Sequence, residues 1–249
     1  MKGTVEILGI PFSKLTLEET TNQLTEHIQN KSELFHLITA NPEIAIKNQT
    51  DKQLQEIIGE ADLITPDGIG IVLAAKRKRE PIQERVTGYD LLLRLLDKGN
   101  ELGWSFYFLG TDEATSKKAA EVIVERYPNI TVAGRHNVFF TAVEEVNILH
   151  DIQSAKPDVL ILAMGAPYSD KWIYKNKQAL ADSKVVFGVG GSLDVIAGKV
   201  NETPQLWKKL YLEWLHRLLT VPVAKGQKSR WRRQSALPKF FYKAIIKQH

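Results

Sequence analysis

The chain has 249 residues, of which 43% are hydrophobic and 25% charged, a composition typical of a globular protein that buries a sizeable core. It contains no cysteine, which excludes disulfide frameworks, thiolate zinc sites and cysteine nucleophiles. No apolar run approaches the roughly 18 residues that span a bilayer. Because the N-terminal sequence MKGTVEILGIPFSK also lacks the apolar stretch of a secretory signal, we expect a cytoplasmic protein.

Charge is distributed unevenly along the chain. The net charge is +4, yet residues 199–249 carry 12 lysines and arginines against 2 acidic residues, whereas residues 1–198 carry 21 against 27. We therefore expect two parts, a body over residues 1–198 and a basic appendage over residues 199–249. A basic appendage suits an anionic partner, and the alternatives are a phospholipid surface, a nucleic acid and a phosphorylated substrate.

The first 198 residues alternate short apolar runs with amphipathic stretches, which predicts a Rossmann-like, mostly parallel sheet flanked by helices. Thr16 and Glu19 form a capping box, which predicts the start of the first helix. A later helix, in GYDLLLRLLDKGNELG, turns four leucines inward: Leu91, Leu92, Leu95 and Leu96. The predicted strands are 4–9, 34–39, 62–65, 104–109, 130–133, 158–164 and 184–189.

Polar residues and glycines collect where these strands are predicted to end. In open α/β sheets, ligands bind outside the carboxyl ends of the strands, and glycines there let backbone N–H groups approach a phosphate. The pattern outlines a nucleotide-diphosphate site. Neither a G-x-G-x-x-G fingerprint nor a P-loop is present, so tight turns without a ligand stay open as an alternative. The turns are Thr39-Ala40-Asn41-Pro42, Pro66-Asp67-Gly68, Gly110-Thr111-Asp112, Gly165-Ala166-Pro167 and Gly188-Val189-Gly190-Gly191.

Asp67 is the strongest candidate for an acid or base, since it lies at a predicted strand end between a proline and a glycine. Its alternative role is to cap the helix that GIGIVLAAKRKR predicts. Thr39 and Asn41 follow a neighbouring strand and suit either a substrate hydroxyl or simple turn chemistry. Arg85 suits either a phosphate clamp or a surface ion pair with Glu84.

Other catalytic chemistries find little support in the sequence. There is no H-E-x-x-H, no D-x-D of the kind that holds Mg²⁺, and the six histidines are scattered, so we expect no metal and no cofactor. A serine triad lacks its G-x-S-x-G turn, and Ser192 stands where a helix N-cap is expected.

The appendage contains two amphipathic stretches. The first, residues 207–218, places apolar side chains on one helical stripe that suits packing on the body or contact with a membrane. The second, residues 229–249, mixes aromatic residues with cations, as interfacial membrane segments do. Its KSRWRR segment also suits nucleic acid as an alternative, although we expect no nucleic-acid partner.

Taken together, these stretches resemble one family, the glycosyltransferases named for the bacterial WecG, TagA and CpsF proteins. The resemblance covers almost the whole chain in the right order. The segments that carry it are TANPEI (39–44), ADLITPDGIGIV (61–72), ERVTGYDLL (84–92), FLG (108–110), PDVLILAMGAPYSDKWI (157–173), GVGGSLDVIAGKV (188–200) and LEWLHRLL (212–219).

The resemblance implies inverting, metal-independent transfer of an N-acetylmannosamine-type sugar from its UDP donor to a lipid-linked acceptor. In the TagA branch, which the sequence resembles most, the acceptor is undecaprenyl-diphospho-N-acetylglucosamine and the product is the linkage disaccharide of wall teichoic acid. Alternatives are a WecG-like uronic acid transferase, a capsule sugar transferase or a non-catalytic nucleotide-binding membrane adaptor. The resemblance also implies a peripheral location on the inner face of the cell membrane, and an exposed apolar stripe would favour self-association into a homo-oligomer.

The resemblance further implies roles for individual residues. Asp67 matches the general base that takes the proton from the acceptor 4-hydroxyl, with Thr39 and Asn41 beside the sugar. Where relatives often have Lys-Gln-Glu, this chain has Tyr168-Ser169-Asp170, so a contact made by the long amide is shorter, water-mediated or absent. The residues expected to bind substrate are Arg85, Gly110, Gly165, Ser169, Gly190, Gly191, Asp194, Arg217, Arg230, Arg232 and Arg233.

Overall fold

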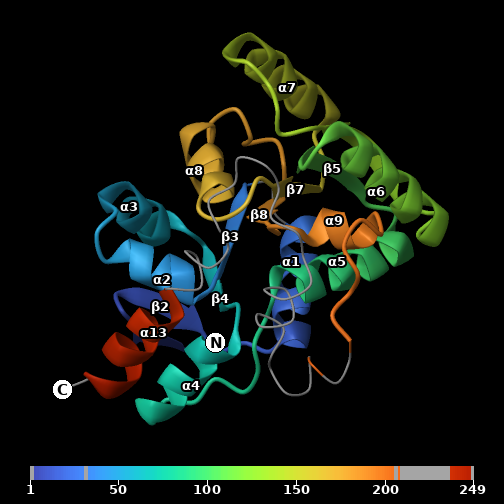
Figure 1. The fold of residues 1–249 in the computed structure, drawn as a ribbon. Coiled ribbons are helices and arrows are strands. Elements are labelled where there is room, and N and C mark those ends of the chain that lie inside the picture. The colour runs from blue at the N-terminus through green and yellow to red at the C-terminus, as the bar shows by residue number, and fades with distance from the viewer. Residues whose placement is uncertain (1–2, 31–32, 205–206, 208–235, 248–249) are drawn as a thin grey trace.

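The computed structural model describes residues 3–30, 33–204, 207 and 236–247. Within these residues, six parallel strands form the main sheet in the spatial order β4-β3-β8-β7-β5-β6 (Figure 1). The predicted α/β class is therefore confirmed. The strands are β3 (Phe35–Ala40), β4 (Leu63–Pro66), β5 (Ser105–Gly110), β6 (Thr131–His136), β7 (Val159–Ala163) and β8 (Val185–Gly188).

The first predicted strand, residues 4–9, does not join this sheet. The chain instead forms an antiparallel hairpin of β1 (Thr4–Ile7) and β2 (Ile10–Ser13). Leu8 and Gly9 make the turn, both with positive φ, 51° and 76°. Glycine tolerates that conformation, whereas leucine rarely adopts it, so the sequence did not predict a turn at Leu8.

One face of the main sheet is covered by α1, α5, α6 and α9 (Figure 1). The four predicted leucines of α5 are fully buried there, because their spacing places them on one side of the helix. The predicted capping box of α1 is confirmed: Thr16 N donates to Glu19 Oε2 (2.8 Å) and Glu19 N to Thr16 Oγ1 (3.2 Å). These helices are α1 (Leu17–Asn30), α5 (Gly88–Leu102), α6 (Glu113–Arg126) and α9 (Ser192–Ile196).

The opposite face is covered by two groups of helices. Trp172 and Ile173 of α8, with Ile148 and Ile152 of α7, pack over the strands from β5 to β8. The helices α2, α3 and α4 enclose a second core with the β1–β2 hairpin. These helices are α2 (Pro42–Asn48), α3 (Lys52–Glu60), α4 (Ile69–Arg77), α7 (Ala142–Ala155) and α8 (Tyr168–Lys175).

The last described elements pack against the body. The helix α13 (Ala236–Phe241) and the π-helical turn η1 (Tyr242–Ile246) lie beside α2 and α4 (Figure 1). Phe240 is fully buried in the core that these helices share, although the sequence predicted it as part of an interfacial segment. Aromatic composition alone does not separate a membrane-facing residue from one that packs on a neighbouring helix. Phe241, Tyr242 and Ile246 do remain exposed.

Candidate active site

The carboxyl ends of the parallel strands bring most of the predicted site residues to one edge of the sheet. The helices after β5 and β7 lead in opposite directions, since α6 precedes the edge strand β6 whereas α8 precedes β8 on the other side. Open α/β sheets bind ligands at the carboxyl ends of two such neighbouring strands, where their connections lead to opposite sides. The predicted residues at this edge are Thr39, Asn41, Asp67, Gly110, Gly165, Gly190 and Gly191.

Asp67 follows β4 directly and is half-buried. Its N–H donates to Ala40 O (3.0 Å), which fixes this residue against the end of β3. The N-cap of α4 is Gly68, with φ +125°, and no side chain bonds to the helix start from that position. The capping position that the sequence left open for Asp67 therefore belongs to its neighbour, and the carboxylate stands at the strand end.

Thr39 is held by two other segments. Its Oγ1 donates to Gly188 O at the end of β8 (3.2 Å). Gly88, the first residue of α5, packs against the same pair: a Cβ there would lie 3.2 Å from Thr39 Oγ1 and 3.3 Å from Gly188 O. The position of the Thr39 hydroxyl thus depends on close contact with α5. The sequence prediction missed Gly88, although a glycine just after the helix cap Thr87 is a signal, because most residues form helices better.

Asn41 begins α2. Its Oδ1 accepts a hydrogen bond from Ile44 N (3.0 Å), and Pro42 occupies the first helical position. The turn chemistry that the sequence offered as one alternative is therefore confirmed, since a short polar cap followed by proline is a preferred helix start. A role for Asn41 beside a substrate sugar stays a prediction.

Arg85 reaches the same edge because its segment runs beside the end of β4. Val86 N donates to Pro66 O (3.0 Å), and Thr65 Oγ1 donates to Val86 O (3.1 Å). The half-buried Arg85 thus stands next to the strand end that carries Asp67.

Ser169 lies in the first turn of α8 and is buried, with 2% of its surface exposed. Its Oγ accepts a hydrogen bond from Met164 N (3.3 Å), and a Cβ at Gly188 would lie 2.8 Å from the Ser169 Cβ. Ser169 therefore joins the loop after β7 to the end of β8. Its predicted contact with substrate stays a prediction.

Asp194 lies in α9 beside the glycine turn that follows β8. Its Oδ1 accepts a hydrogen bond from Thr111 Oγ1 (2.8 Å), and Lys199 Nζ lies 3.8 Å from the same oxygen. Lys199 also pairs with Asp112. The hydrogen bond from Lys199, followed by one from Thr115 N, lowers the pKa of Asp112 from 3.8 to about 2. The sequence prediction missed Lys199, because a contact between residues far apart in the chain leaves no local signal.

The sequence of this chain matches known proteins. Residues 5–249 match the model of the glycosyl transferase WecG/TagA/CpsF family. The chain belongs to this glycosyltransferase family. A Bacillus spizizenii relative, 33% identical over 92% of this chain and 84% of its own, is named N-acetylglucosaminyldiphosphoundecaprenol N-acetyl-beta-D-mannosaminyltransferase. A Staphylococcus aureus relative with the same name is 32% identical over 96% of this chain and 91% of its own.

Four predicted substrate ligands of this glycosyltransferase, Arg217, Arg230, Arg232 and Arg233, lie outside the described residues, as do residues 208–218 of the apolar stripe. Their roles stay predictions. Among the residues that the structure does describe, no group of three or more histidine, aspartate or glutamate side chains is arranged to hold a metal ion.

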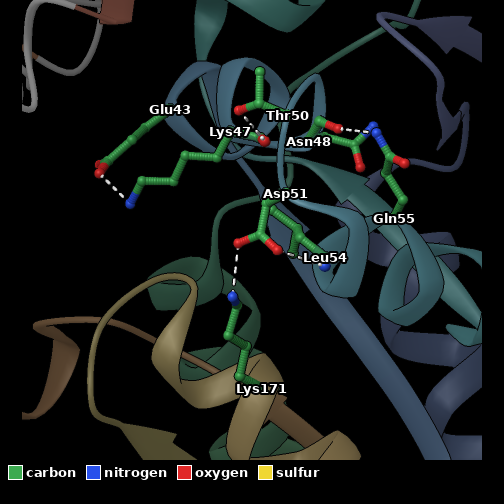
Figure 2. A network of polar contacts seen from close by, with 8 residues as sticks. All are labelled: Glu43, Lys47, Asn48, Thr50, Asp51, Leu54, Gln55 and Lys171. Atoms are coloured by element: carbon green, nitrogen blue, oxygen red, sulfur yellow. Dashed lines mark hydrogen bonds and ion pairs between the residues drawn. The ribbon is translucent and has the colours of Figure 1, made fainter.

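A hollow of about 310 Å³ lies between the α2–α3 turn and the start of α8. Figure 2 shows that its two lysines are already paired: Lys171 with Asp51 (2.6 Å) and Lys47 with Glu43 (2.8 Å). Asp51 also caps α3, and the hydrogen bond from Lys171 lowers its pKa. A diphosphate bound to these lysines would have to displace both carboxylates. The hollow is therefore a poorer anion site than the glycine turns.

Proposed function

We propose that this glycosyltransferase transfers N-acetylmannosamine from its UDP donor to undecaprenyl-diphospho-N-acetylglucosamine, with inversion and without a metal ion. The observation that carries the proposal is the place of Asp67: a half-buried carboxylate just after β4, in a chain whose relatives bear the name of this transferase. The product would be the linkage disaccharide of wall teichoic acid.

In the proposed reaction, the Asp67 carboxylate accepts the proton of the acceptor 4-hydroxyl while that oxygen attacks the anomeric carbon of the donor. The bond from the anomeric carbon to the diphosphate oxygen breaks as the new glycosidic bond forms on the opposite face, and UDP leaves. As a carboxylate at the strand end, Asp67 acts as the base when the acceptor hydroxyl lies within hydrogen-bond reach. Thr39, fixed against β8 and α5, and Asn41 stand beside it at the neighbouring strand end.

The departing diphosphate gains negative charge that must be stabilised. We assign this task to the backbone N–H groups of the turns after β7 and β8 and to Arg85. Gly165 and Gly190 support this role, since both have a positive φ (82° and 56°) and neither would bring a Cβ within 4 Å of another atom. These turns are therefore open on the side where a side chain would stand.

The proposal includes peripheral binding to the inner face of the cell membrane, where the acceptor lies. The C-terminal elements pack against α4, and together they expose apolar and basic side chains. Such a mixture suits the interface of an anionic membrane. No described helix is long and apolar enough to cross a bilayer. We call these residues the C-terminal surface: Leu73, Lys76, Arg77, Arg79, Lys239, Phe241, Tyr242, Lys243, Ile246 and Lys247.

The C-terminal surface is joined to the proposed site by Phe240, which packs beneath that surface against α2 and α4. A Cβ at Gly70 would lie 3.0 Å from Pro42 Cγ and 3.4 Å from Phe240 Cε1. Phe240 thus lies against the first turns of α2 and α4, the helices that follow Asn41 and Asp67. This packing supports the idea that membrane contact brings the lipid-linked acceptor to the strand ends.

The donor sugar is tested by turnover. Purified protein is mixed with anionic vesicles that contain lipid-diphospho-N-acetylglucosamine, with EDTA present, and UDP release is followed for two donors. We expect acceptor-dependent release from UDP-N-acetylmannosamine and at least about tenfold slower release from its uronic acid analogue. Faster release from the uronic acid would favour the WecG-like alternative. Binding of both donors without any release would favour the non-catalytic adaptor.

A further inference from the structure

A cluster of polar side chains joins the end of β5 to the segment after α9. Lys199 Nζ contacts the Asp112 carboxylate and lies 3.8 Å from Asp194 Oδ1. Asp194 Oδ1 also accepts the hydrogen bond from Thr111 Oγ1 (2.8 Å). One carboxylate oxygen of Asp194 is therefore engaged by two partners from different parts of the chain.

Thr111, which makes this contact, has an unusual backbone conformation. Its φ is +52°, a left-handed conformation that is unfavourable for a residue other than glycine and that tends to occur at functional sites. Two backbone hydrogen bonds hold it there: its N–H donates to Ala163 O (3.1 Å), and its carbonyl accepts from Val138 N (2.8 Å). Gly110 precedes it with φ +140° and has no space for a Cβ, which would lie 2.5 Å from the carbonyl carbon of Ala163.

Asp112 anchors the lysine. As the N-cap of α6, its carboxylate accepts hydrogen bonds from Thr115 N (2.9 Å) and Thr115 Oγ1 (2.8 Å). Lys199 donates a hydrogen bond to this carboxylate, and that hydrogen bond raises the pKa of Lys199. The lysine thus remains a fixed positive charge beside Asp194.

The second oxygen of Asp194 faces the glycine turn after β8. A Cβ at Gly191 would lie 3.5 Å from Asp194 Oδ2. This turn is one of those to which we assign the nucleotide donor. A carboxylate repels a diphosphate but accepts hydrogen bonds from hydroxyl groups, so the fitting partner for Oδ2 is a hydroxyl of the donor's ribose.

We propose that Lys199 is a positioning residue: with Thr111 it holds one oxygen of Asp194, so that the other oxygen accepts a hydrogen bond from a ribose hydroxyl of the nucleotide donor. This inference rests on the proposed function, because it takes the glycine turns as the donor site. Lys199 acts on the ligand only through Asp194. An exposed ion pair with a purely structural role contributes little to stability and would leave nucleotide affinity unchanged.

The test is a double-mutant cycle read out by UDP affinity, which depends neither on the donor sugar nor on turnover. Calorimetry gives the Kd of UDP for the full chain and for Lys199→Met, Asp194→Asn and the double variant. We expect each single variant to weaken UDP about tenfold. The double variant should bind no more weakly than Asp194→Asn alone, because Lys199 acts through that carboxylate. Lys199→Arg should recover most of the affinity.

Lys118→Met is the matched control, since Lys118 lies on α6 and forms an exposed ion pair with Glu121 (3.7 Å). It should leave the Kd of UDP unchanged. If Asp194→Asn weakens UDP while Lys199→Met does not, or if the two losses multiply in the double variant, the inference is overturned and the proposed function stands. If the wild-type chain does not bind UDP at all, the proposed function itself fails.

Discussion

Replacing Gly88 with alanine tests whether the packing of α5 sets the position of Thr39. Gly88 begins α5 without a left-handed φ, so alanine suits its backbone and favours the helix by up to about 1 kcal/mol. The added Cβ would stand 3.2 Å from Thr39 Oγ1 and 3.3 Å from both Gly188 O and Val189 Cα. Overpacking of this kind costs about 1–3 kcal/mol.

The net destabilisation of Gly88→Ala is therefore about 0–3 kcal/mol, which lowers the Tm by up to about 12 °C. Because two of the crowded contacts are backbone atoms, Thr39 is the group that gives way. We expect UDP release to fall about tenfold or more at 25 °C, since small displacements of positioning groups cost far more in rate than in stability.

Gly59→Ala provides the control for this experiment. Gly59 lies inside α3, and a Cβ there would meet no atom within 4 Å. This variant should gain about 0.5–1 kcal/mol in stability and keep full activity. Circular dichroism melts and the UDP-release assay are run on both variants. A Gly88→Ala protein that is folded and as active as wild type would refute the argument that α5 positions Thr39.

The other predictions concern acid stability and the C-terminal elements. The hydrogen bond from Lys199 lowers the pKa of Asp112 from 3.8 to about 2. The Asp112 carboxylate therefore stabilises the folded state above pH 3.8, and this contribution is lost as the pH falls towards 2. In the Lys199→Met variant the Tm should fall less steeply between these two pH values. Equal slopes for both proteins would contradict the assigned cause. Phe240→Ala should cost about 3–5 kcal/mol and lower the Tm by about 6–20 °C, because Phe240 is fully buried. Phe241→Ser, at an exposed position, should shift the Tm by only a few degrees but reduce sedimentation with phosphatidylglycerol vesicles, and unchanged vesicle binding would count against the C-terminal surface.

Elements with a regular apolar period could be predicted from the sequence. The α5 leucines have the spacing of one helix face, and the apolar runs DVLILAM (158–164) and KVVFGV (184–189) are typical of buried strands. The structure confirms α5, β7 and β8. The gathering of glycines and polar residues could be predicted for a different reason, since the carboxyl ends of parallel strands lie on one edge of the sheet.

The remaining features depend on contacts between distant segments. The β1–β2 turn uses Leu8 in a conformation that leucine rarely adopts, so the sequence carried no turn signal. Phe240 has the composition of an interfacial residue, and only its packing on α2 and α4 shows that it is buried. The tight contact of Gly88 and the pairing of Lys199 with Asp112 likewise join residues far apart in the chain.

The central claim is that Asp67 removes the proton of the acceptor hydroxyl. Its most direct test is acceptor-dependent UDP release from UDP-N-acetylmannosamine by wild type and Asp67→Asn. Asp182→Asn is the control, because Asp182 is exposed and forms an ion pair with the exposed Lys156 (3.3 Å). We predict that Asp67→Asn loses at least about a hundredfold in rate while its affinity for UDP and its Tm stay near those of wild type. A folded Asp67→Asn protein that turns over as fast as wild type would show that the base lies elsewhere and would contradict the claim.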